Sequence, residues 1–92
     1  MHTDTPAFSW RVNADAALPD VAPPGLADEV ARAFRADGGL PDVTIVGGAL
    51  HLQVHARGRT KDDAEHAVAQ GLAAVLRDLG QGEVHVRASV VL

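Results

Sequence analysis

Residues 43–54 read VTIVGGALHLQV and predict a tight β-hairpin. Gly47 and Gly48 suit a two-residue turn, because both turn positions of the favoured type need a positive φ. Such a turn sets Val46 opposite Ala49, and the rest of the pairing follows from it. The aliphatic residues then share one face of the hairpin, namely Val43, Ile45, Leu50, Leu52 and Val54. The other face carries Thr44, Val46, His51, Gln53, His55 and Arg57.

The chain before the hairpin predicts one strand and one helix. From Phe8 onward apolar and polar residues alternate, which is the period of a half-buried strand with its inward side made of Phe8, Trp10 and Val12. The segment Asp15–Pro24 carries three prolines and predicts a loop, either a spacer or a binding loop. A helix is predicted from Gly25 to Asp37, with a buried stripe of Leu26, Val30, Ala33 and Phe34. It should end at Gly38-Gly39, with Pro41 just beyond.

The chain after the hairpin predicts a second helix and a last strand. Thr60 is a suitable N-cap, and Asp63 stands three residues later at the position of a capping box. The helix should end at Gly80, and its buried stripe consists of Ala64, Val68, Leu72, Val75 and Leu79. A strand is predicted from about Glu83 to Leu92, with an inward side of Val84, Val86, Ala88 and Val90.

Each predicted strand has one apolar face, so both helices must cover the same side of one sheet. Right-handed crossovers then lead to a split βαβ arrangement. The predicted fold is therefore α+β, a ferredoxin-like α/β plait (βαββαβ) with a four-stranded sheet of order 4-1-3-2 and two helices on one face. We expect the first and third strands to be central and parallel to each other, and the C-terminal strand to form an edge.

Length and composition bound the classes of function. The 92 residues suffice for a single domain, 1–92, in which residues 1–6 read as a flexible leader. The chain has no cysteine, which removes disulfides, thiolate metal sites and cysteine nucleophiles. A net charge of −4 argues against general electrostatic binding to nucleic acid or to an anionic membrane. Neither a signal-peptide pattern nor a membrane-length apolar run is present, so we expect a cytoplasmic location.

The outward residues of the predicted sheet are rich in Arg and His. All acidic residues are assigned to the leader, loops, helices and strand ends, so none is expected on this face. Arg presents a planar fork that suits carboxylate or phosphate, and His adds charge in mild acid. The candidate ligand-binding residues are therefore Arg11, His51, His55, Arg57, His85 and Arg87. The alternative interpretation is the ordinary solvated side of a sheet that helices cover on one face only.

Other kinds of site receive less support from the sequence. No metal site is expected, because His51 and His55 lie about 13 Å apart on one strand and no carboxylate is expected near them. No catalytic residue or cofactor is predicted, since no acid is expected on this face to orient an imidazole. Plaits that bind RNA stack bases on aromatic side chains of the central strands, whereas the matching positions here carry Arg, Ser, His and Gln.

Two functions remain as hypotheses. The first is a small non-enzymatic binding or regulatory module, dimeric, whose open Arg/His sheet face contacts an anionic small molecule or an acidic protein partner. The alternative is a small enzyme or enzyme subunit with a histidine general base on the same face, at an oligomer interface. We expect the partner to be a second copy (a homodimer) or another protein, because Val90, Val91 and Leu92 make both sides of an edge strand apolar.

Overall fold

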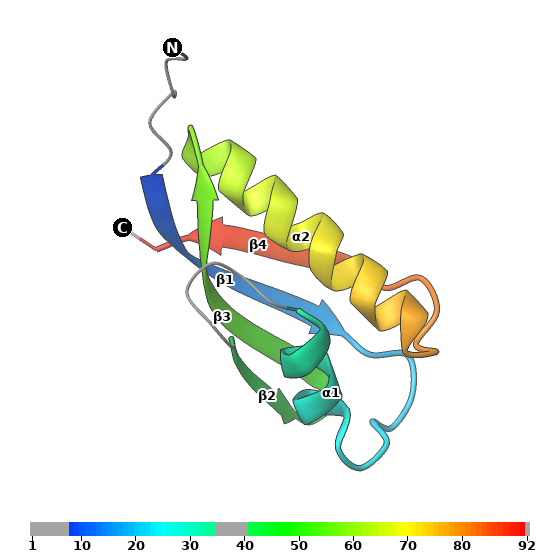
Figure 1. Ribbon diagram of the computed structural model, residues 1–92. Helices are drawn as coiled ribbons and strands as arrows, with labels where there is room; N and C mark the ends of the chain where they lie inside the picture. Colours follow the sequence, from blue (N-terminus) through cyan, green and yellow to red (C-terminus); the bar gives the residue numbers. More distant parts are fainter. Residues whose placement is uncertain (1–7, 35–40, 92) are drawn as a thin grey trace.

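The computed structural model arranges the chain as strand, helix, strand, strand, helix, strand (Figure 1). It describes residues 8–34 and 41–91; the predicted leader at 1–6, the helix stop at 38–39 and Leu92 lie outside this range. The elements are β1 (Phe8–Ala17), α1 (Leu26–Ala33), β2 (Asp42–Val46), β3 (Ala49–Gly58), α2 (Lys61–Asp78) and β4 (Val86–Val90).

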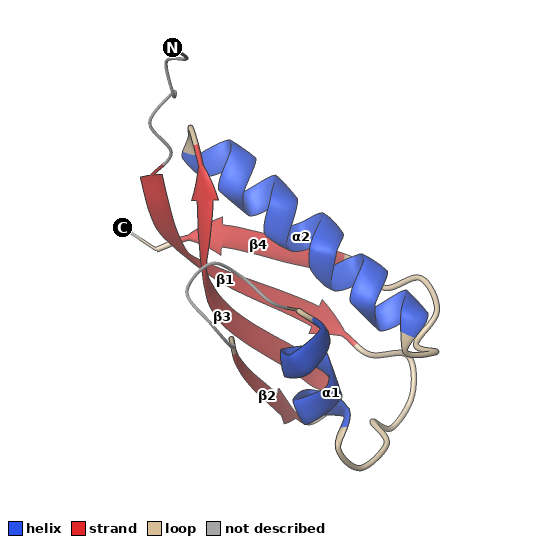
Figure 2. Cartoon of the chain, viewed as in Figure 1, coloured by secondary structure: helices blue, strands red, loops and turns tan. Residues whose placement is uncertain are grey.

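The four strands form one sheet of order β2-β3-β1-β4, as the sequence predicts. Both helices lie on the same side of it (Figure 2), and the fold is a ferredoxin-like α/β plait. The expectation that the first and third strands are parallel is wrong, because β1 pairs with β3 in the antiparallel sense. The crossover through α1 leaves a gap of one strand between β1 and β2, and the hairpin returns β3 into that gap in the opposite direction.

The hairpin confirms the predicted register. Val46 pairs with Ala49 and Val43 with Leu52, and both turn glycines have positive φ, 58° at Gly47 and 80° at Gly48. The period of two therefore holds along the sheet and sends one set of side chains beneath the helices. That set joins residues of both helices in a core of Val12, Ala14, Ala16, Leu26, Val30, Leu50, Leu52, Val54, Ala64, Val68, Leu72, Leu76 and Val84.

Helix α2 covers most of the sheet, and its start is set by local chemistry. The side chain of Thr60 accepts a hydrogen bond of 3.1 Å from the backbone N–H of Asp63, which confirms the predicted N-cap. Leu76 is fully buried although the sequence analysis omitted it, while Val75 and Leu79 are half-buried. Helix α1 buries Leu26 and Val30.

Two residues that were predicted to be buried are exposed. Phe8 is 56% exposed, because it stands at the first position of β1, and Ala33 on α1 is exposed. Trp10 is half-buried, and its indole N–H donates to the carbonyl of Gly58 at 2.9 Å. Gly58 is closely surrounded, since a Cβ there would lie 3.1 Å from the backbone N of Ala64 and could fit only if its neighbours shifted slightly. The N-terminal end of β1 is thus fixed by polar and aromatic contacts more than by deep burial.

The strand ends differ from the predicted ones, and this changes the charge of the exposed face. β1 continues to Ala17, β2 begins at Asp42, and β4 is shorter than expected, covering only Val86–Val90. No helix within the described ranges is long and apolar enough to span a membrane.

Candidate functional site on the open face

The side of the sheet that the helices leave uncovered, called the open face below, collects exposed side chains from all four strands. Cross-strand pairing arranges these side chains in rows across the sheet. Successive rows on this face are two residues apart along a strand, or about 7 Å. One row consists of Thr44, His51, Asp15 and Arg87. The next row consists of Asp42, Gln53, Asn13 and Ser89, and the two beyond it pair His55 with Arg11 and Arg57 with Ser9.

The open face carries acidic side chains, so the prediction that it has none is wrong. Asp15 lies within β1 and pairs with His51 on one side and Arg87 on the other. Asp42 is the first residue of β2. Aspartate is rare in strands. At Asp15, however, pairing with a basic neighbour on each side favours an extended backbone. The period of two continues through Ala14 and Ala16, and this alternation was the signal that could have extended the predicted strand.

Asp15 and His51 form a side-chain pair on this face. Nδ1 of His51 lies 2.5 Å from Oδ1 of Asp15, and the two side chains are 53% and 62% exposed. An ionised carboxylate can only accept hydrogen bonds, so Nδ1 must carry the proton in this contact. The other ring nitrogen, Nε2, is left for a ligand or substrate. The pair therefore fixes the orientation and the tautomer of an accessible imidazole.

Arg11 and His55 form the second notable pair. They are directly opposite each other on β1 and β3, and both are exposed. The flanking positions on these two strands are neutral or basic, and the nearest acidic residue of the neighbouring strand is Asp42 on β2, opposite Gln53. We call this region the Arg11 half of the open face; it consists of Ser9, Arg11, Asn13, Gln53, His55 and Arg57. The Asp15 half consists of Thr44, His51, Asp15 and Arg87.

The six predicted site residues therefore separate into groups. Arg11, His55 and Arg57 share the Arg11 half, whereas His51 and Arg87 flank Asp15. Arg87 is level with Asp15, four residues from Arg11 along β1, or about 13 Å. The backbones of Arg11 and Arg87 are thus much farther apart than those of Arg11 and His55, which are directly opposite each other. His85 is exposed but precedes β4, whose pairing with β1 begins at Val86.

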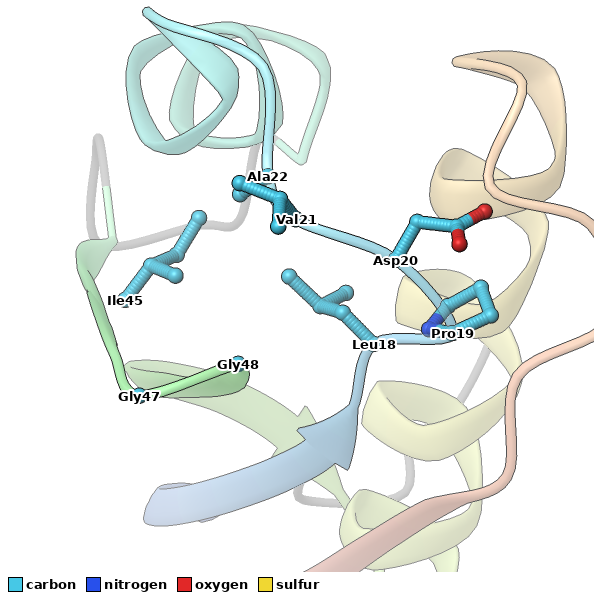
Figure 3. Close-up of a pocket in the computed structure, with 8 residues that line it drawn as sticks. All are labelled: Leu18, Pro19, Asp20, Val21, Ala22, Ile45, Gly47 and Gly48. Carbon is cyan, nitrogen blue, oxygen red and sulfur yellow. The ribbon is translucent and has the colours of Figure 1, made fainter.

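A shallow apolar groove lies at the C-terminal end of β1, next to the loop 18–25 that connects β1 to α1. It is bounded by the loop and by the β2–β3 turn (Figure 3), and its lining includes Leu18, Val21, Ala22 and Ile45. The N–H of Leu18 donates to the carbonyl of Gly48 at 2.8 Å and ties the loop to the turn. Val21 is 93% exposed and Asp20 points away from the apolar side chains. The sequence predicts this loop to be either a spacer or a binding loop. In the structure it links β1 to α1 and is anchored to the hairpin.

The chemistry of the open face is that of a polar binding surface. Within residues 8–34 and 41–91, no three His, Asp or Glu side chains are grouped so that they could hold a metal ion. The described residues also contain no buried polar or charged side chain, so the polar groups of this face all meet water. Comparison with protein-family models, with curated proteins and with solved structures finds no match.

Proposed function

We propose that the protein is a non-enzymatic binding or regulatory module whose Arg11 half binds an anionic group. The observation that supports this is the direct pairing of Arg11 with His55, flanked on β1 and β3 by residues that are neutral or basic. The anion would be the phosphate or carboxylate of a small molecule. The acidic side chain of a protein partner offers the same chemistry.

The geometry suits an anion for three reasons. Neighbouring strands are about 4.8 Å apart, so the side chains of Arg11 and His55 can reach one anion together. The guanidinium offers a planar fork of N–H donors. The amides of Asn13 and Gln53, opposite each other in the next row, add neutral donors on the same side. Because the site is open to water, binding should be modest and sensitive to salt.

The proposal is tested with inorganic sulfate as the probe, followed by calorimetry or by NMR of the purified chain. Arg11→Ala should weaken sulfate binding about tenfold or more, since a charge-assisted hydrogen bond is lost. The matched control is Arg32→Ala, which removes the same charge from exposed α1. Equal loss in both variants, or no loss in Arg11→Ala, would contradict the proposal.

Two further arms sharpen this test. Sulfate keeps its charge between about pH 5 and 8, where histidine gains a proton, so binding should strengthen as the pH falls and His55→Ala should reduce that response. The charged neighbours of His55 in the sheet are Arg11, directly opposite on β1, Arg57 two residues along β3, and Asp42 on β2, which is diagonal to His55 because it pairs with Gln53. An acidic peptide that binds where sulfate does not would point to a protein partner instead of a small molecule.

The second candidate function is catalysis with His51 as a general base, and the contact between His51 and Asp15 favours it. With its proton on Nδ1, the imidazole can accept a proton at Nε2 from an attacking water. An ester probe such as p-nitrophenyl acetate would then yield acetate and p-nitrophenol. We place this candidate second because both side chains are more than half exposed, whereas oriented catalytic dipoles act most strongly where water is excluded.

The catalytic candidate is tested by comparing the two exposed histidines of β3. Hydrolysis of p-nitrophenyl acetate should fall more in His51→Ala than in His55→Ala, and Asp15→Asn should lower it through loss of the fixed tautomer. NMR correlation of ring nitrogens and protons reports that tautomer directly. If His51→Ala and His55→Ala lose the same small rate, the activity is that of any exposed imidazole and the candidate fails.

A further inference from the structure

The outer edge of β4 is partly occupied by a side chain of α2. The backbone N–H of Val90 donates to Oε2 of Glu65 at 2.8 Å, whereas the N–H of Val91 donates to the carbonyl of Arg11 on β1 at 2.8 Å. Because successive residues of a strand direct their backbone groups to opposite sides, the backbone groups of Val86, Ala88 and Val90 face away from β1. In the part of the chain that the structure describes, β4 ends the sheet and no strand pairs with this edge.

This edge is complementary to itself. In an antiparallel pairing centred on Ala88, each Ala88 faces the other, and Val86 faces Val90 of the second copy. Arg87 then stands opposite Ser89 on the open face, so no like charges are directly opposed. In that register the N–H of Val90 would donate to the carbonyl of Val86 in the second copy. It is the same N–H that Glu65 occupies.

We propose that β4 pairs with β4 of a second copy across a two-fold axis, and that Glu65 weakens this dimer by competing for the N–H of Val90. The carboxylate accepts the hydrogen bond that the incoming strand would need, so it must release the edge before pairing is complete. The dimer would join the two sheets into one continuous sheet and leave the Arg11 half of each copy facing solvent. The inference does not depend on anion binding, because it uses backbone atoms of the edge.

The test is sedimentation velocity over a range of protein concentrations. Glu65→Ala frees the N–H of Val90. The dimer dissociation constant should then fall about tenfold, because pairing no longer has to break a charge-assisted hydrogen bond to the carboxylate of Glu65. Asp78→Ala is the matched control, since it removes an exposed acid from the other end of α2. Its dissociation constant should equal that of the parent chain.

A second variant identifies the surface that associates. Ala88→Pro removes an N–H that faces away from β1 and places the ring on the outer edge, so pairing through β4 should be lost while the sheet survives. Circular dichroism confirms the fold of each variant. The proposal is overturned if Glu65→Ala associates no more strongly than the parent chain. It is also overturned if Ala88→Pro, in the Glu65→Ala background, still dimerises equally well.

Discussion

The two faces of the sheet are built from alternating residues of the same four strands, yet they differ in almost every physical property. The face beneath the helices is aliphatic, and its buried residues join those of both helices and Val84 in a core of thirteen hydrophobic residues among those the structure describes. The open face carries guanidinium, imidazole, amide and carboxylate groups in ordered rows. Side chains only one residue apart along a strand can therefore serve stability on one face and recognition on the other. Substitutions on one face should therefore leave the property of the other unchanged.

The largest expected effect comes from the helix that covers the inward face. Leu72 of α2 is fully buried, so Leu72→Ala should lower the free energy of unfolding by about 2–5 kcal/mol through lost burial and a cavity. Gln70→Ala, two residues away and exposed, should change it by less than about 0.5 kcal/mol. Urea unfolding followed by circular dichroism measures both. Similar losses in the two variants would mean that α2 does not pack as described.

A matched substitution compares the two faces more directly. Val54 is 4% exposed beneath the helices, whereas Val46 is 70% exposed on the open face. Val54→Thr places a hydroxyl among aliphatic groups and should cost about 1–3 kcal/mol of unfolding free energy. Val46→Thr keeps a β-branched residue in water and should change it by less than about 0.5 kcal/mol. If the two variants show equal shifts in thermal unfolding temperature, the assignment of Val54 and Val46 to opposite faces of the hairpin is wrong.

The smallest effect divides the open face itself. Asp15 lies about 13 Å from Arg11 along β1. This is longer than the Debye length in physiological salt, so the interaction between the two exposed charges is largely screened. Asp15→Asn should therefore change sulfate affinity at the Arg11 half by less than about twofold. Calorimetric titration in physiological salt measures this change. A change of tenfold would show that the Asp15 half and the Arg11 half act as one site.

The hairpin shows what the sequence could predict. Glycines at 47 and 48 fix a two-residue turn, so the register from Val43 to Val54 follows without tertiary information. The order of strands followed from the single apolar face of each strand together with right-handed crossovers. The relative direction of β1 and β3 was predicted incorrectly, although the connectivity through the hairpin already required them to be antiparallel.

The charge of the open face was harder to predict, because it depends on where strands end. Asp15 resembles the start of a loop by composition, and although the alternation through Ala14 and Ala16 hints at a longer strand, its pairing with His51 and Arg87 on neighbouring strands is what shows that β1 continues past it. Strand length is thus decided by tertiary pairing, which local propensity does not contain. The contact of Glu65 with Val90 is likewise invisible in the sequence, since it joins residues 25 positions apart through the packing of α2 on β4.

Whether the Arg11 half of the open face binds anions can be decided by one NMR titration. Sulfate is added to the isotope-labelled chain while backbone and guanidinium N–H signals are followed by NMR. The account predicts saturable shifts centred on Arg11, Asn13, Gln53 and His55, with α1 and α2 unchanged. Shifts centred on the helices, or no saturable shift at all, would contradict it.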